Sequence, residues 1–349
     1  MSAAILAGHL RRLFGNGRET LASSLFAKLV LGRLRLRGHD LTAQHVVWAY
    51  RLLLGREPES ATVVLEKLRR WRTARELLLE IMTSEEFRLG HPDVGYLSEP
   101  NVVIKELDGG LRLFVDLCDY FVGAQIVKGV YEPDETAFVR RTVRSGQSVV
   151  DVGANVGYYS ILMADLVGAD GLVHSFEPVA WCADLLTRSI VENRFEDRVK
   201  LERRAVGDRG GLVRLGFQPG ALNQGGAQLV TAAGAPRGHR VVEVPIVALD
   251  ECDLRRPVGF VKVDAEGAER LVVRGAKRLL RDDRPIVLAE LNRPQLALVS
   301  GCTPEDLAGE VESLGYTVHY LRGPDLTPGI PKVSGERVRS AVFLPRVGS

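Results

Sequence analysis

A glycine-rich turn in the middle of the chain has the composition of a cofactor-binding loop. Residues 151–157 read Asp-Val-Gly-Ala-Asn-Val-Gly, and they follow a short apolar stretch. Glycine allows a ligand to approach the backbone closely, and N–H groups at the start of a following helix can point at that ligand. The turn therefore predicts a cofactor site that includes Asp151, Gly153, Asn155 and Gly157, although the same residues could simply shape a tight turn.

An acidic residue further along narrows the choice of cofactor. Glu177 and Pro178 lie where a second strand should end, and a carboxylate there can accept hydrogen bonds from the ribose hydroxyls of a nucleotide. A dinucleotide fingerprint requires glycines at n, n+2 and n+5, but Asn155 and Tyr158 occupy the later two positions. The Gly-Lys-Ser/Thr end of a phosphate-binding loop is absent from the sequence. A wider turn with an acid before it suits a cofactor with an amino acid moiety and no phosphate, namely S-adenosylmethionine.

A third motif follows the next predicted strand. Residues 205–208 read Ala-Val-Gly-Asp. In a nucleotide-binding sheet of this order the loop lies beside the base, so we expect Ala205 at the cofactor and Asp208 at the adenine amino group. The alternative is that Asp208 belongs to a surface turn.

Acidic residues also follow the later strands, and these are the candidate catalytic groups. Asp264 ends an apolar stretch, Glu266 falls at the start of the next helix, and Glu290 ends the following strand. These carboxylates should meet at the carboxyl edge of the sheet, where they could deprotonate a hydroxyl or bind a divalent metal. No histidine joins this stretch, and we predict no metal. We expect Asp264 to act as general base with Glu266 beside it and Glu290 as the next candidate; Asp264 could instead contact the cofactor. Glu269 could be only an acid favoured by the helix dipole.

The elements that must position these residues alternate between strands and helices. This alternation predicts an α/β fold with a mostly parallel sheet and helices on both faces. Near the end, residues 317–320 and 341–344 predict a closing antiparallel pair, and residues 220–238 predict a long glycine-rich loop. The predicted strands are 148–152, 172–176, 199–201, 258–263 and 286–291, and the predicted helices are 135–143, 158–167, 181–193, 266–280 and 304–314.

The front of the chain is different, because it is helical and rich in Arg and Leu. Thr42 is the expected N-cap of a helix that Gly55 ends, and Thr73 with Glu76 forms a capping box. A hairpin signal follows at residues 108–110, Asp-Gly-Gly. The predicted organisation is a helical N-terminal domain over 1–95, a hairpin and helix connection over 96–145, and the cofactor-binding domain over 146–349.

Composition limits the partners and the compartment. The chain has 349 residues and a formal net charge of +2, which argues against a nucleic-acid partner. No apolar run is long enough to be a transmembrane segment, because Lys28, Arg33 and Arg35 interrupt the best candidate, residues 21–36. Residues 1–14 do not resemble a signal peptide, although they could form a short amphipathic segment that touches a membrane. The four cysteines are far apart and form neither a zinc pattern nor a disulfide framework, so we expect a cytoplasmic protein.

Together the motifs of residues 125–292 resemble the FkbM family of methyltransferases. The resemblance implies a class I methyltransferase fold with a Rossmann-like sheet, S-adenosylmethionine as the cofactor, and often O-methylation of sugars or other hydroxyl-bearing natural products. Ala265 departs from the family, in which a larger apolar residue is usual. The matching segments are 129–133, 151–160, 176–178, Asn193, 205–208, 249–250, 262–269, 275–276 and 285–290.

The front of the chain is similar to a short helical bacterial domain of unsettled function, on the basis of residues 49–58, Trp71 and residues 83–87. That domain often accompanies surface-polysaccharide proteins, so the resemblance implies a docking partner. Two functions remain: a methyltransferase acting on a small-molecule or glycan hydroxyl, and a non-catalytic module that binds the cofactor or a partner in a polysaccharide assembly system. The intact glycine turn and Glu177 favour the enzyme, and the glycine spacing argues against a nicotinamide oxidoreductase.

Overall fold

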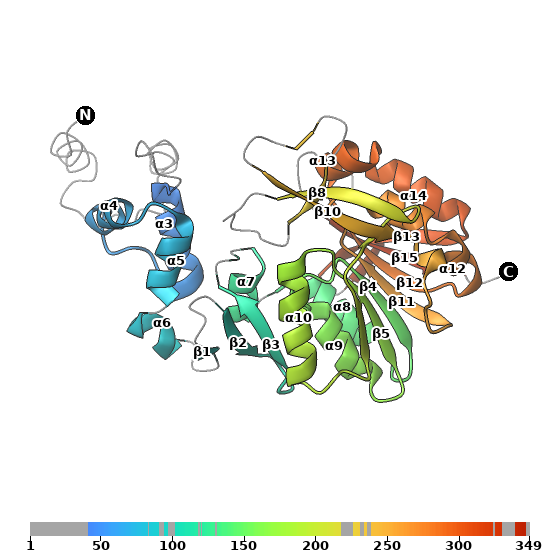
Figure 1. Cartoon of the computed structure of the whole chain (residues 1–349), viewed down its shortest axis with the longest axis horizontal. Coiled ribbons are helices and arrows are strands. Elements are labelled where there is room, and N and C mark those ends of the chain that lie inside the picture. Colours follow the sequence, from blue (N-terminus) through green and yellow to red (C-terminus); the bar gives the residue numbers. More distant parts are fainter. Residues whose placement is uncertain are drawn as a thin grey trace. The chain divides into compact units, whose positions relative to one another are not determined.

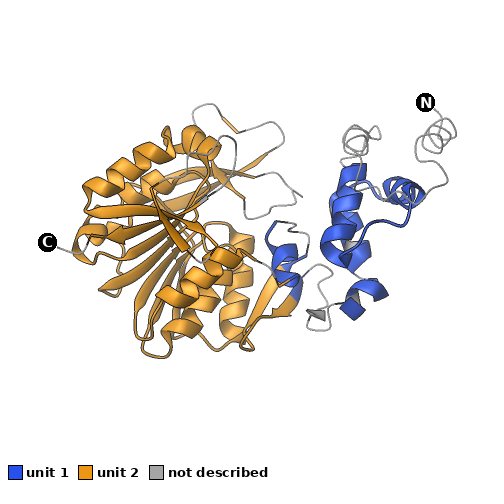
Figure 2. Ribbon diagram, turned by 180° about the vertical axis from the view of Figure 1, so that it is seen from behind, with its two compact units in different colours: residues 1–103, 116–128 blue, residues 104–115, 129–349 orange. Residues whose placement is uncertain are grey.

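Two compact units make up the chain in the computed structural model. The structure describes residues 41–346 apart from 83, 91–93, 97–101, 118, 120, 130, 218–225, 231–233, 236–238, 324 and 330–338. The first unit comprises residues 1–103 and 116–128, and the second comprises 104–115 and 129–349 (Figure 2). The domain limits expected at residues 95 and 145 stay a prediction. Among the described residues no helix is long and apolar enough to cross a membrane, and the stretches 1–14 and 21–36 lie outside them.

The first unit is helical, and its helices begin at the predicted caps. α3 (Ala43–Ala49) starts after Thr42, and the following π-helix η1 (Tyr50–Leu54) ends at Gly55 in the left-handed conformation. Before α5 (Ala74–Met82), the Thr73 hydroxyl accepts a hydrogen bond from the Glu76 N–H at 3.3 Å, and the Glu76 carboxylate accepts one from the Thr73 N–H at 3.0 Å. Both predicted caps are therefore confirmed. The other helices are α4 (Ala61–Arg70), α6 (Glu85–Gly90) and α7 (Gly123–Val127).

A small sheet has the strand order β1-β2-β3. Gly109 and Gly110 both have positive φ between the second and third strands, which confirms the predicted hairpin. The strands are β1 (Val94–Tyr96), β2 (Val102–Glu106) and β3 (Arg112–Asp116).

The core of the second unit is an eight-stranded sheet with the order β14-β13-β15-β12-β11-β4-β5-β6 (Figure 1). The strands from β12 to β6 are parallel, whereas β15 is antiparallel to both β12 and β13. The predicted parallel strands and the predicted closing pair are confirmed. The strands are β4 (Ser148–Val152), β5 (Leu172–Phe176), β6 (Val199–Glu202), β11 (Val258–Val263), β12 (Ile286–Leu291), β13 (Tyr316–Arg322), β14 (Asp325–Pro328) and β15 (Arg339–Pro345).

Helices follow the strands and pack against the sheet. α9 packs on β4 and β5, and α14 packs on β13. The helices of this unit are α8 (Pro133–Thr142), α9 (Tyr158–Val167), α10 (Ala180–Glu192), η2 (Leu249–Glu251), α11 (Glu269–Arg274), α12 (Lys277–Asp282), α13 (Arg293–Gln295), η3 (Leu296–Ser300) and α14 (Pro304–Ser313).

The single helix predicted over 266–280 is wrong. Glu266 and Gly267 have φ values of 49° and 96°, so the helical conformation begins only at Glu269. A break at Gly275 then separates α11 from α12. The backbone of Gly275 passes so close to Gly207 that an added Cβ would lie 1.9 Å from the Gly207 carbonyl oxygen. Tertiary packing therefore decides where this helix stops.

A second sheet, with the order β7-β10-β8-β9, was not predicted. β8 and β10 pair antiparallel, from Gly211 opposite Ile246 to Phe217 opposite Arg240. Within β10, Val244 and Ile246 are buried whereas Glu243 and Pro245 are exposed, so this stretch carries the alternation that predicts a strand, and the prediction missed it. β9 lies within the predicted loop 220–238, much of which is outside the described residues. The strands are β7 (Ala205–Val206), β8 (Gly211–Phe217), β9 (Gln228–Leu229) and β10 (Arg240–Val247).

Candidate active site

The register of the parallel strands brings the predicted motifs to one edge of the sheet. Val152 at the end of β4 pairs with Phe176 of β5 on one side and with Val263 of β11 on the other. The residues that follow these ends, among them Glu177 and Asp264, therefore share the carboxyl edge, where open α/β sheets bind ligands.

Gly153 joins two of these strand ends. Its φ is 76°, and a Cβ added to it would lie 1.8 Å from the carbonyl oxygen of Asp264. The Asp264 N–H donates to the Val152 carbonyl at 3.0 Å, and the N–H groups of Gly153 and Ala154 both donate to the Phe176 carbonyl at 3.0 Å. Within the described structure, glycine at position 153 is thus required by the close approach of another backbone.

Glu177 is buried beside the turn, with only 4% of its surface exposed. One carboxylate oxygen accepts a hydrogen bond from the Asn155 N–H at 2.8 Å, and the other accepts one from the Val179 N–H at 2.7 Å. Burial raises the pKa of Glu177 to about 7, although these two backbone donors oppose the shift. Each oxygen retains lone-pair capacity for a further donor, such as a ribose hydroxyl.

A pocket opens between the strand ends and the second sheet. Of the predicted cofactor and catalytic residues, Gly153, Asn155, Glu177, Pro178, Ala205, Asp264 and Glu266 line this pocket. The rest of its lining is Val152, Phe176, Val179, Arg204, Val206, Leu215, Ala227, Leu229, Ala265 and Ala268. The lining is largely apolar and includes the carboxylates of Glu177, Asp264 and Glu266, which suits a nucleoside joined to a charged amino acid part.

Asp151, Gly157, Asp208 and Glu290 are not among the lining residues. Asp151 is buried and accepts a hydrogen bond from the Ser160 hydroxyl at 2.6 Å, and Gly157 precedes α9, where a Cβ would lie 2.3 Å from Leu186. Both residues have contacts within the turn and its neighbouring helices, and their expected place at the cofactor stays a prediction. Asp208 is exposed, so its location lends no support to the expected adenine contact.

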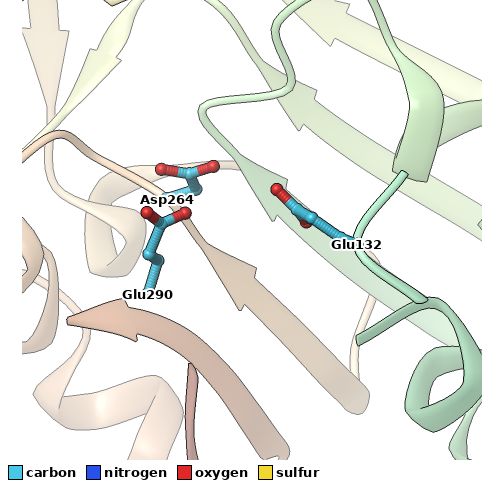
Figure 3. A group of neighbouring side chains, drawn as sticks. All are labelled: Glu132, Asp264 and Glu290. Atoms are coloured by element: carbon cyan, nitrogen blue, oxygen red, sulfur yellow. The ribbon is translucent and has the colours of Figure 1, made fainter. Parts of the chain in front are cut away.

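Three carboxylates meet beside this pocket, but they are not the predicted trio. Glu132, Asp264 and Glu290 each offer an oxygen, and these oxygens lie within 4.8 Å of one another (Figure 3). Glu266 instead accepts a hydrogen bond from the side-chain amide of Gln295. Glu132 comes from the segment just before α8, so the cluster joins residues from distant parts of the sequence.

Crowding raises the pKa values of two acids of this cluster, Glu132 and Glu290, and of Glu266 in the pocket lining. The nearby charge of Asp264, together with burial, raises the pKa of Glu290 well above its ordinary range. Burial raises the pKa of Glu132, and the positive charge of Lys262 opposes that shift. Burial, with the charge of Asp264, raises the pKa of Glu266 to about 7. Acids with raised pKa values can hold or take up protons near neutral pH, as general acid–base catalysis requires.

Lys262 supplies the positive charge among these acids. Its ammonium lies 3.3 Å from Asp264 Oδ2 and 4.7 Å from the ring centre of Tyr159, whose hydroxyl donates to Glu132 Oε2 at 2.7 Å. The spacing of the three carboxylates would suit a divalent ion. Because Lys262 already brings a cation to the same place, we assign no metal, and the expected absence of one stays a prediction.

Sequence reasoning missed Glu132, Tyr159 and Lys262 as site residues. Each lies in a segment that carried the family resemblance, and that was the available signal. The sequence around Glu132 contains no pattern that indicates a contact with Asp264. Lys262 is a single polar residue in an otherwise apolar strand, which by itself indicates no role in the site.

The fold and the site together define a class of protein. Three features characterise a class I S-adenosylmethionine-dependent methyltransferase. The antiparallel strand β15 lies between β12 and β13 in an otherwise largely parallel sheet, a glycine turn follows β4, and an acidic residue follows β5. Residues 151–316 match the model of the methyltransferase FkbM domain. This segment is a methyltransferase domain of the FkbM family, with S-adenosylmethionine as its cofactor.

The individual proteins that the chain resembles match it over a short stretch or at low sequence identity. The chain is 36% identical over 59 residues to a protein-L-isoaspartate O-methyltransferase of Methanocella arvoryzae, a match that covers 17% of this chain and 31% of that protein. A methyltransferase FkbM structure from Methylobacillus flagellatus is 15% identical, with a TM-score of 0.39, over 84% of this chain and 58% of that one. Aeropyrum pernix fibrillarin, solved with natively bound S-adenosyl-L-methionine, is 12% identical, with a TM-score of 0.36, over 72% of this chain and 97% of that one.

Proposed function

We propose that this protein is an O-methyltransferase that transfers the methyl group of S-adenosylmethionine to a hydroxyl of a sugar, a glycan or a related small molecule. The observation that carries the proposal is the position of Asp264, which both lines the cofactor pocket and belongs to the carboxylate cluster. A proton acceptor therefore lies beside the place where the methyl donor would bind. That juxtaposition suits an acceptor whose nucleophile is a hydroxyl group.

The residues of the pocket fit the cofactor. Glu177 would accept hydrogen bonds from the ribose hydroxyls. Backbone donors already hold both of its carboxylate oxygens in place for that contact. Leu215 and Leu229 of the second sheet would enclose the adenosine part. When bound, S-adenosylmethionine supplies an electrophilic methyl group. Holding it close to the acceptor would provide much of the rate.

Asp264 would remove the acceptor's proton. A hydroxyl is a poor nucleophile, so its oxygen forms the new bond to carbon more readily as a carboxylate takes its proton. The bound donor would supply the methyl group and leave as a neutral thioether, so the proton to be placed is the one that Asp264 would accept. Glu290 is the next candidate for the base, and Glu266, which also lines the pocket, would support Asp264.

A transfer assay tests this proposal. Purified protein is incubated with methyl-labelled S-adenosylmethionine and with nucleotide sugars, lipid-linked glycans or small phenols. Asp264→Asn should bind S-adenosylhomocysteine nearly normally and lose about 10²–10⁴-fold in turnover. Asp165→Asn, which makes the same change on the exposed side of α9, is the matched control. Turnover of Asp264→Asn within a few-fold of wild type would exclude Asp264 as the base, and a parallel loss of cofactor affinity would make it a cofactor ligand.

The assay also separates the enzyme from a non-catalytic module. A module would bind S-adenosylhomocysteine but transfer no label to any acceptor class. A docking partner for the helical first unit and a cytoplasmic location remain expectations of the sequence.

A further inference from the structure

A charged lysine lies inside the parallel sheet. Lys262 stands between Val261 and Val263 in β11, and only 6% of its surface is exposed. An ammonium removed from water is costly unless it is paired. Burial would lower the pKa of Lys262, but the charges of Asp264, Glu132 and other acids raise it overall. The lysine is therefore held as a cation by its acidic neighbours.

Those neighbours come from four separate segments of the second unit. Besides Asp264 and Glu132, the acids that act on Lys262 are Asp151 of β4 and Glu290 of β12. Asp151 is the direct register partner of Lys262 on the neighbouring strand, and one of its buried oxygens has no hydrogen-bond partner. Among the described residues, the Lys262 ammonium is thus the positive charge that acts on Glu132, Asp151 and Glu290 together.

Lys262 also connects two of these acids in space. Its ammonium contacts Asp264 Oδ2 directly, at 3.3 Å, and lies over the ring of Tyr159. The hydroxyl of Tyr159 in turn donates to Glu132 at 2.7 Å. Glu132 has a φ of 41°, a conformation that is costly for a residue with a side chain and that persists only when its surroundings enforce it.

We propose that Lys262 is a positioning residue of this active site: its ammonium orients and neutralises the Asp264 carboxylate and, through the Tyr159 ring, fixes Glu132 on the opposite side of the cluster. The inference rests on the proposed function, because it concerns the same carboxylates. Oδ2 of Asp264 is held by the lysine, so Oδ1 is the oxygen that remains outside the ion pair and can receive the acceptor's proton.

Removal of the ammonium should make the stability of the fold more sensitive to pH. In Lys262→Met the acids lose their cation, so their ionisation inside the protein becomes more costly. Carboxyl groups whose pKa is raised by folding contribute stability that is lost as pH rises through that pKa. Stability of the variant should therefore decline more steeply with pH than that of wild type, while Lys262 in the wild type stays protonated throughout the range tested.

The experiment measures melting temperature from about pH 5.5 to 9 in the full-length protein. The difference between wild type and Lys262→Met should widen by at least about 4 °C from the acid to the alkaline end. In Lys262→Arg, which retains the charge, the difference from wild type should widen by no more than half as much as in Lys262→Met. Tyr159→Phe, which retains the lysine but removes the donor to Glu132, should show a smaller change of the same sign. Lys277→Met removes an exposed lysine charge and is the matched control, with a constant difference.

A difference that is equal at every pH for both Lys262→Met and Tyr159→Phe would overturn the proposal. If Lys262→Met does not fold, Tyr159→Phe decides alone: a difference from wild type that is equal at every pH would then overturn the proposal. Affinity for S-adenosylhomocysteine at pH 6 should stay within about threefold in Lys262→Met; a larger loss would mean that the lysine serves the cofactor pocket instead.

Turnover provides a separate readout. With an acceptor identified in the transfer screen, Lys262→Met should lose at least about tenfold in kcat, with little change in KM for S-adenosylmethionine. Unchanged kcat would refute the positioning role. A screen that finds no acceptor would instead count against the proposed function, and the pH series would still decide whether Lys262 controls the carboxylates.

Discussion

Replacement of Gly153 by alanine tests how tightly the cofactor turn and the catalytic strand are joined. Two costs can be worked from the structure. A φ of 76° is unfavourable for any residue with a Cβ, by roughly 1–2 kcal/mol. The new methyl group would also lie 1.8 Å from the Asp264 carbonyl oxygen, far inside contact distance, so the backbone must move. Overpacking of this kind typically costs about 1–3 kcal/mol.

The two costs together give about 2–5 kcal/mol, which corresponds to a fall of roughly 4–20 °C in melting temperature for a domain of this size. Because the displaced atoms belong to Asp264 and to the turn itself, affinity for S-adenosylhomocysteine should fall as well. Differential scanning fluorimetry and calorimetry measure the two effects. Gly309→Ala is the matched control: Gly309 is exposed within α14 with nothing near its Cβ position, so alanine there should be neutral or stabilise by about 0.5–1 kcal/mol. A Gly153→Ala protein that melts within about 1 °C of wild type and binds normally would refute the reasoning.

The remaining predictions concern buried polar groups. Glu177→Ala should weaken binding of S-adenosylhomocysteine at least about tenfold in calorimetry, since each hydrogen bond to a charged group is worth roughly 1.5–3 kcal/mol. Glu196→Ala, at an exposed position, is the control and should bind like wild type. Equal affinities of Glu177→Ala and wild type would remove Glu177 from the ribose site. Burial raises the pKa values of Glu177, Glu266 and Glu269 from 4.5 to about 7, so the stability that they contribute is complete below about pH 4.5 and is lost as pH rises through 7. The melting temperature of the ligand-free protein should therefore fall between about pH 5.5 and 8.5, and a rise over that range would contradict the assignment. Tyr316→Phe should cost about 1 kcal/mol, because the fully buried hydroxyl donates to a main-chain carbonyl at 3.0 Å; no change in denaturant midpoint would mean that this bond is not stabilising.

The sequence by itself determined the catalytic-domain sheet and the edge at which ligands bind. Each central strand is a short apolar stretch with a turn signal after it, and such signals are local. Parallel strands with helical connections must end at the same edge, so the sequence alone predicts that Gly153, Glu177 and Asp264 lie together. The helix caps at Thr42 and Thr73 were predictable for the same reason, since a cap depends on residues three positions apart.

Only the tertiary structure decided the composition of the carboxylate cluster. The cluster contains Glu132 and not the predicted Glu266, because the segment before α8 packs beside the ends of β11 and β12. This contact joins residues more than a hundred positions apart, so no local sequence pattern records it. Lys262 is similar: its strand reads as apolar, and the role of its charge follows only from the acids that surround it in space. Gly275, where α11 ends, lies so close to the Gly207 backbone that no Cβ fits there, and local helix propensity does not record this packing between distant segments.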